Sequence, residues 1–159
     1  MPSGRPEFTA DLPRKRMAVA LLITGADQRI MLVEPACQAV WEIPGGCVEA
    51  DESPYQAAIR EGREELGLTL SPGRLLVVDW VPPADGRTEG VMFVHDVGTL
   101  DAARAPRIVV PPDELTSWAW SDRSETAQRL PPLDTRATEA LGARADTSTR
   151  YLENGVRAI

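Results

Sequence analysis

The stretch from Gly45 to Leu68 limits what this chain can fold into more than any other part of its sequence. Ser53 is a predicted N-cap, and Pro54 suits the first helical position because its missing N–H is not needed there. Gln56 lies three residues after Ser53 and completes a capping box. Gly67 is placed to end the helix as its left-handed residue. We therefore predict a glycine loop followed by one capped helix.

The predicted helix has an apolar side and an acidic side. Glu61, Glu64 and Glu65 are spaced i, i+3, i+4, so their carboxylates share one side and repel one another. A divalent cation would reverse that repulsion, and oxygen ligands select a hard ion, Mg²⁺ or Mn²⁺. The alternative is a solvated acidic face with Arg60 and Arg63 as local counter-charges. The expected buried face consists of Tyr55, Ala58, Ile59, Gly62 and Leu66.

Gly45 and Gly46 favour a binding site over a plain acidic surface. Glycine lets the backbone turn sharply and approach a ligand closely. The two glycines follow Trp41-Glu42-Ile43-Pro44, which is predicted to be a short apolar strand. A strand, a double-glycine loop and an acidic helix in succession therefore predict a site.

This stretch resembles the signature of the Nudix family. The signature reads Gly, five residues, Glu, seven residues, Arg-Glu, an aliphatic residue, any residue, Glu-Glu, any residue, Gly, an aliphatic residue. Gly62 departs from it, because it stands where the signature has the aliphatic residue after Arg-Glu. The positions that match in register are Gly46, Glu52, Arg60, Glu61, Glu64, Glu65, Gly67 and Leu68.

The resemblance implies an α/β/α sandwich around a central mixed β-sheet, in the α/β (α+β) class. It also implies a hydrolase that cleaves a pyrophosphate bond with Mg²⁺, for which Mn²⁺ substitutes. Glu61 would also orient or deprotonate the attacking water. Glu52 and Arg60 would join the loop to the helix, although a salt bridge to Glu64 also explains Arg60. The implied metal ligands are Glu61, Glu64, Glu65 and the carbonyl oxygen of Gly45.

Residues outside the signature bear on the substrate. A Nudix group that acts on ADP-ribose carries a proline after the signature, and Pro83 stands at the matching offset with Glu89 following. A nucleoside diphosphate derivative such as ADP-ribose is therefore the leading substrate. A nucleoside triphosphate, or a nucleotide-sensing domain without catalysis, is the alternative. Trp41 would stack a base unless it belongs to the core. The expected substrate contacts are Gly45, Gly46, Glu89 and Trp41.

The whole chain has the size and composition of one globular domain, with 159 residues, 43% of them hydrophobic. A net charge of −7 argues against non-specific binding to nucleic acid or to an anionic membrane. The apolar run Met17–Ile23 follows a basic triplet but is too short to span a bilayer, so we expect a core strand in a cytoplasmic protein. Cys37 and Cys47 are expected to be free thiols, with a Cys–His95 nucleophile as the alternative.

The order of elements also indicates an α/β sandwich with a mixed sheet. We expect a mobile arm at 1–16, the Nudix-like domain at 17–145 and a tail at 146–159. Asn154-Gly155 is a hairpin signal, and its short strands must pack on the domain or on a second subunit, which leaves a homodimer open. The predicted strands are 17–24, 29–34, 40–43, 75–81, 89–97 and 116–121, and the later helices are 124–130 and 134–144.

Gly62 removes a side chain that the signature normally buries. We expect Trp80 or Met92 to fill that space and to come close to the helix backbone. A larger residue at position 62 would then overpack the site.

Overall fold

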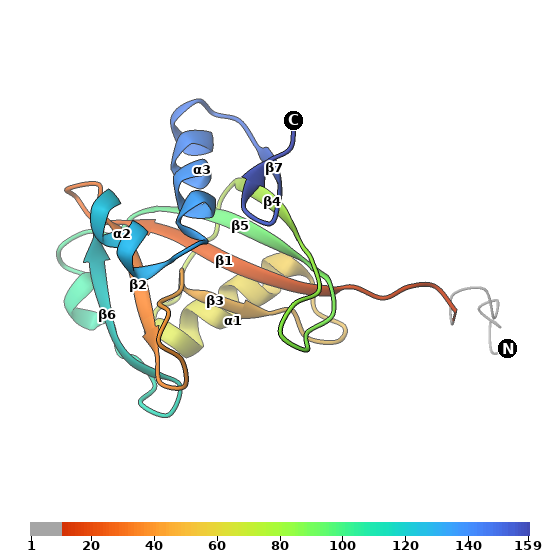
Figure 1. Ribbon diagram of the computed structural model, residues 1–159. Helices are drawn as coiled ribbons and strands as arrows, with labels where there is room; N and C mark the ends of the chain where they lie inside the picture. Colours follow the sequence, from red (N-terminus) through yellow and green to blue (C-terminus); the bar gives the residue numbers. More distant parts are fainter. Residues whose placement is uncertain (1–10) are drawn as a thin grey trace, which may run out of the picture.

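The computed structural model describes residues 11–159 and has three layers (Figure 1). Helix α1 covers one face of a mixed sheet, and α2 and α3 cover the other, which confirms the predicted sandwich. The strands are β1 Arg16–Thr24, β2 Ile30–Pro35, β3 Gly45–Cys47, β4 Leu75–Val81, β5 Gly90–Thr99, β6 Leu115–Ser121, β7 Arg150–Glu153 and β8 Val156–Arg157. The helices are α1 Pro54–Leu66, the 3₁₀ helix η2 Ala105–Arg107, α2 Arg123–Arg129 and α3 Asp134–Ala145.

The strands form one sheet in the order β6-β2-β1-β5-β4-β7-β8, with β3 also pairing to β1. The β1–β5 and β4–β7 pairs are parallel and the other pairs are antiparallel. The central strand β1 is apolar from Met17 to Ile23, and it is buried from Val19 onward because both of its faces are covered there. Val19, Leu21 and Ile23 face the α1 layer, while Ala20 and Leu22 face the layer of α2 and α3.

The predicted strand at 40–43 is wrong. Only Glu42 in this segment forms a bridge, to Val33, and the strand that follows consists of the residues expected to form the glycine loop. A Cβ on Gly45 would lie 2.0 Å from the Val19 carbonyl oxygen and 2.8 Å from the Ala20 Cα. Strand propensity disfavours glycine, but here the close approach of two backbones requires it.

Helix α1 has the predicted ends. The Ser53 hydroxyl accepts from the Gln56 N–H at 3.2 Å, and the Gln56 side chain accepts from the Ser53 N–H at 2.9 Å. Gly67 is left-handed, with φ 66°. The predicted buried face is wrong at Tyr55, which is 47% exposed. The Tyr55 ring lies edge-on to His95 of β5, with 6.1 Å between the ring centroids, whereas α1 as a whole packs against both β1 and β3.

The space beside Gly62 is filled by Leu70 and Leu21, so the expectation of Trp80 or Met92 is wrong. A Cβ on Gly62 would lie 3.0 Å from Leu70 Cδ1 and 3.6 Å from Leu21 Cδ1. Met92 instead packs in the core on the other face of the sheet. The segment after α1 turns back over the helix and supplies the missing apolar bulk.

The C-terminal hairpin forms as predicted and packs on the domain, because β7 pairs with β4. Asp79, which is fully buried, holds its turn in place. The Asp79 carboxylate accepts from the Gly155 N–H at 3.0 Å and from Arg136 Nε on α3 at 2.6 Å.

The predicted N-terminal arm, 1–16, lies partly outside the described residues, since these begin at residue 11. Arg16 belongs to β1, and Lys15 pairs with Glu89. Cys37 and Cys47 are free thiols. Within residues 11–159, every helix is too short or too polar to traverse a bilayer.

Replacing Gly62 by leucine is expected to lower the free energy of unfolding by about 1–3 kcal/mol, because Leu70 already occupies the space. Urea denaturation would measure the change. The double variant Gly62→Leu/Leu70→Ala should recover much of the loss. A single variant more stable than the native protein would contradict this account.

Asp79→Ala is expected to cost about 3–5 kcal/mol of unfolding free energy, since it leaves the Arg136 charge buried without a partner. The matched control is Asp27→Ala, which removes an exposed ion pair with Arg29 and should have a much smaller effect. Chemical denaturation of both variants would test the difference. Equal losses would show that the Asp79 contacts do not hold the hairpin.

Candidate active site

The carboxylates of α1 meet the backbone of β3. Glu61 and Glu65 are only 8% and 7% exposed, so two of the three glutamates lie on the buried side of the helix rather than on a solvated acidic face. The Gly45 N–H donates to Glu65 Oε2 at 2.7 Å. A Cβ on Gly46 would lie 2.3 Å from Glu61 Oε1, so the missing side chain makes room for that carboxylate.

The carbonyl oxygen of Gly45 is left out of the pairing with β1. Pro44 O accepts from the Leu21 N–H at 2.7 Å, and the Val48 N–H donates to Met17 O at 2.9 Å. In an antiparallel ladder the residues that bond to the partner alternate, so Gly45 directs both its N–H and its C=O away from β1. The Gly45 carbonyl oxygen is therefore available on the α1 side of the strand as a possible metal ligand.

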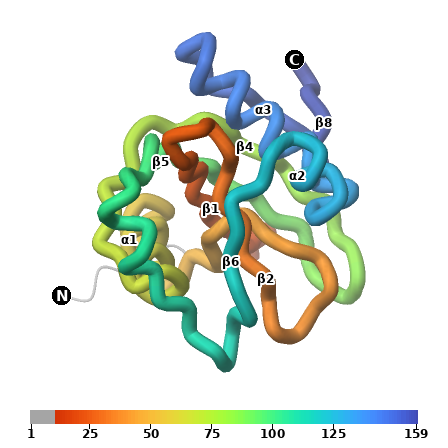
Figure 2. The backbone as a smooth tube through the Cα atoms, turned by 90° about the vertical axis from the view of Figure 1, so that its left-hand side faces the viewer, coloured from red at the N-terminus to blue at the C-terminus, as the bar shows by residue number. Residues whose placement is uncertain are grey.

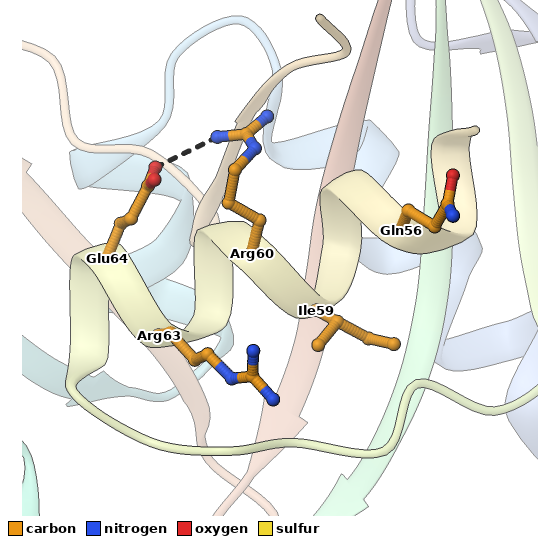
Figure 3. A pocket seen from close by; sticks show the side chains of 5 residues that line it. All are labelled: Gln56, Ile59, Arg60, Arg63 and Glu64. Atoms are coloured by element: carbon orange, nitrogen blue, oxygen red, sulfur yellow. Dashed lines mark hydrogen bonds and ion pairs between the residues drawn. The ribbon is translucent and has the colours of Figure 1, made fainter. Parts of the chain in front are cut away.

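Arg60 links the loop, the strand and the helix. Its guanidinium binds Glu52 through two bonds, at 2.8 and 2.9 Å, and donates to the Cys47 carbonyl oxygen at 2.8 Å. Arg60 Nη1 also donates to Glu61 Oε1 at 2.8 Å and to Glu64 Oε2 at 2.9 Å. Figure 3 shows the Arg60–Glu64 contact along the outer side of α1. Both explanations offered for Arg60, a loop-to-helix link and a helical salt bridge, therefore describe contacts that are present.

The electrostatics of the site follow from burial and from this arginine. Burial raises the pKa of Glu65 to about 8, against the opposing effect of the Gly45 N–H. Burial also raises the pKa of Glu61, and the Arg60 guanidinium partly offsets this. The hydrogen bonds from Arg60 lower the pKa of Glu52 to about 2. At Glu61 and Glu65 the nearby hydrogen-bond donors and positive charge therefore do not fully offset the cost of burying the ionised carboxylate.

Two further carboxylates, which the sequence did not point to, act on the cluster through their charge. The charges of Glu42 and Glu114 add to the raised pKa of Glu65. Glu42 comes from the segment before β3, and Glu114 precedes β6. They are distant from α1 in sequence and share no spacing with its glutamates, so no pattern could have linked them.

The donor chemistry of the cluster fits a hard divalent cation, although the side chains do not already converge on one point. Within residues 11–159, no three Asp, Glu, His or Cys side chains are arranged to hold an ion. Glu61, Glu64 and Glu65 offer carboxylate oxygens and Gly45 a carbonyl oxygen, the ligand set that Mg²⁺ and Mn²⁺ prefer. Because Gly46 has no side chain, the Glu61 carboxylate can lie against the β3 backbone.

Trp41 and Glu89 lie outside the carboxylate cluster. Trp41 is half-buried and packs on the core beneath α2 and α3, with the Arg129 guanidinium 4.6 Å from its ring centre. Glu89 accepts from Trp80 Nε1 at 3.0 Å and pairs with Lys15. His95 contacts the Gly73 carbonyl oxygen and the Tyr55 ring rather than either cysteine.

The chain is similar to known proteins over most of its length. The model of the NUDIX domain family matches residues 14–141. The human 8-oxo-dGDP phosphatase NUDT18 is 30% identical over 124 residues, which are 69% of this chain and 38% of that protein. The CTP pyrophosphohydrolase of Escherichia coli is 41% identical over 63 residues, 37% of this chain and 47% of that protein. This chain therefore spans less than half the length of either relative.

A solved structure shares the fold. The crystal structure of a MutT NUDIX hydrolase from Burkholderia pseudomallei superposes with a TM-score of 0.68 and is 26% identical. The match covers 81% of this chain and 99% of that one.

Gly46→Ala is expected to leave the fold intact and to weaken Mn²⁺ binding by about tenfold, because the new Cβ displaces the Glu61 carboxylate. Calorimetric titration with Mn²⁺, together with thermal unfolding, would measure both effects. The companion variant Gly45→Ala meets the Val19 backbone instead and should mainly lower stability. Native Mn²⁺ affinity in Gly46→Ala would contradict the proposed role of the glycine.

Proposed function

Because the chain belongs to the Nudix family, we propose that it hydrolyses the pyrophosphate bond of a nucleoside diphosphate linked to another group. One observation carries the proposal. The docking of α1 on β3 places the buried carboxylates of Glu61 and Glu65 against the backbone of Gly45 and Gly46. Three glutamates on one side of a helix repel one another and so do not stabilise the fold, which favours a functional role for them.

The residues that would hold the metal are Glu61, Glu64, Glu65 and the Gly45 carbonyl oxygen. Bound Mg²⁺ or Mn²⁺ would neutralise charge on the phosphate oxygens and lower the pKa of a coordinated water. Glu64 is the ligand most open to solvent, with 53% of its side chain exposed. It therefore lies where a phosphate group arriving from solvent can reach it.

The chain's own groups position the reaction. Arg60 fixes Glu61 through Nη1 and ties the loop to β3 through Glu52 and the Cys47 carbonyl oxygen. Glu61 is thereby oriented to direct the attacking water or to accept its proton. A carboxylate held next to the attacking water can act as its general base.

The leading substrate is ADP-ribose or a related nucleoside diphosphate derivative. The support is the placement of Pro83 and Glu89 after the signature. The turn between them is closed by a bridge from Ala84 to Arg87, and Glu89 is held by Trp80. This ordered turn joins the end of β4 to the start of β5, next to the start of β1.

A nucleoside triphosphate is the second candidate, and the name of one relative, the CTP pyrophosphohydrolase, favours it. A second relative is named for a nucleoside diphosphate, 8-oxo-dGDP. Both names describe phosphate chains on a nucleoside rather than a nucleoside diphosphate joined to a sugar. In either case the substrate is a small nucleotide.

Glu64→Gln and Glu65→Gln are each expected to lower kcat by about two orders of magnitude or more, because each removes one ligand charge while keeping the side-chain shape. The control Glu153→Gln removes an exposed charge on β7 and should keep native turnover. Chelation should abolish activity, and added Mg²⁺ or Mn²⁺ should restore it. Native turnover in Glu64→Gln would rule out the hydrolase proposal, and the absence of any cleavage would favour a sensing domain.

A substrate panel of ADP-ribose, UDP-glucose, CTP and 8-oxo-dGDP separates the two substrate candidates. We expect the largest kcat/KM for ADP-ribose, with AMP and ribose 5-phosphate as products because the cut falls within the pyrophosphate. Chromatography of the products would identify the bond broken. A kcat/KM about tenfold larger for CTP would replace ADP-ribose with a triphosphate.

A further inference from the structure

A hollow of about 440 Å³ lies beyond the C-terminal end of α1, apart from the carboxylate cluster. We propose that it is a second site, which binds the phosphate group of a small anion. Its lining residues are Gly67, Leu68, Thr69, Arg104 and Arg107. None of the five belongs to the predicted active site, and the proposal does not depend on the hydrolase function.

Arg104 and Arg107 project from the same side of a 3₁₀ turn. The Arg107 N–H donates to the Arg104 carbonyl oxygen at 2.9 Å, which closes that turn at η2. In 3₁₀ geometry the side chains at i and i+3 are eclipsed, unlike those of an α-helix. The two guanidinium groups are therefore directed into the same hollow.

The wall that carries these arginines is held firmly against the protein. Arg104 Nη2 donates to the Thr69 carbonyl oxygen at 2.9 Å, and the Val109 N–H donates to the Leu66 carbonyl oxygen at 3.0 Å. Ala105 and Ile108 pack on the core beneath α1. Figure 2 shows this green segment, between β5 and β6, beside α1.

Neither arginine has a carboxylate partner among the described residues. The ion pairs within 11–159 involve other basic side chains, although the chain carries a net charge of −7. The nearby Asp101 carboxylate accepts from the backbone N–H groups of Ala103 and Arg104. The Arg104 guanidinium has five N–H groups, and one of them donates to the Thr69 carbonyl oxygen. Most of the others remain available to bind a ligand.

The end of a helix is ordinarily unfavourable for an anion, because its free carbonyl groups carry partial negative charge. Here those groups are largely occupied. The carbonyl oxygens of Gly62, Arg63 and Leu66 accept from the N–H groups of Leu68, Gly67 and Val109, respectively. The arginines therefore set the sign of the local charge.

Phosphate is the anion that best matches these donors. Guanidinium groups bind tetrahedral oxyanions through paired, charge-assisted hydrogen bonds. The hollow is larger than one phosphate and is of a size that accepts a pyrophosphate or a nucleoside monophosphate. The shared chemistry is the phosphate group, which either of these sources would present.

The test is an NMR titration of the full chain in excess EDTA, so that no divalent metal is available to the carboxylate cluster. Sodium pyrophosphate and AMP are the two probes and distinguish a free phosphate ligand from a nucleotide. We expect at least one probe to cause saturable shifts at Thr69 and from 104 to 107. Shifts confined to 45–65, or none with either probe, would overturn the proposal.

The double variant Arg104→Gln/Arg107→Gln is expected to weaken this binding by about tenfold or more, while Mg²⁺-dependent turnover is retained. Arg123→Gln/Arg157→Gln removes the same charge elsewhere and should bind as the native protein does. Equal affinities in the two double variants would overturn the site. Arg107→Gln alone, which leaves the Arg104–Thr69 bond in place, serves if the double variant does not fold.

Discussion

The contact between α1 and β3 is the constraint on which the rest of this structure depends. Two glycines make it possible, because a side chain on Gly45 would strike β1 and one on Gly46 would strike Glu61. With no Cβ atoms in the way, the strand pairs with β1 and packs against the helix, and the free Gly45 amide binds Glu65. The fold thus turns an acidic helix face into a buried one, and the same contact orients the groups that the proposed reaction needs.

Burying carboxylates is costly, and the arrangement limits that cost without removing it. Arg60 neutralises the outer part of the cluster by contacting Glu52, Glu61 and Glu64. Glu65 lies deeper and has only the Gly45 amide, so burial raises its pKa to about 8. Such an imbalance is typical of functional sites, where stability is given up for chemistry. The residual negative charge also explains why a divalent cation suits this cluster better than a further arginine.

The other side of the sheet is organised by a second buried charge, which joins structural elements. Asp79 joins β4, α3 and the turn at Gly155 through hydrogen bonds to a guanidinium and an amide. This connection lets two very short strands extend the sheet, although such a hairpin is not stable alone. The chain therefore uses buried acids in two ways, fully paired where they hold structure and incompletely paired where we propose chemistry.

The sequence by itself determined the helix with its caps, most strands and the family, because these depend on local spacing and on residues such as Ser53 and Gly67. Tertiary structure decided what local patterns do not contain. It made a strand of Gly45 and Gly46, because only packing shows that two backbones must come close. It also brought Glu42 and Glu114 near enough for their charges to raise the pKa of Glu65, because electrostatic effects act through space and not along the chain.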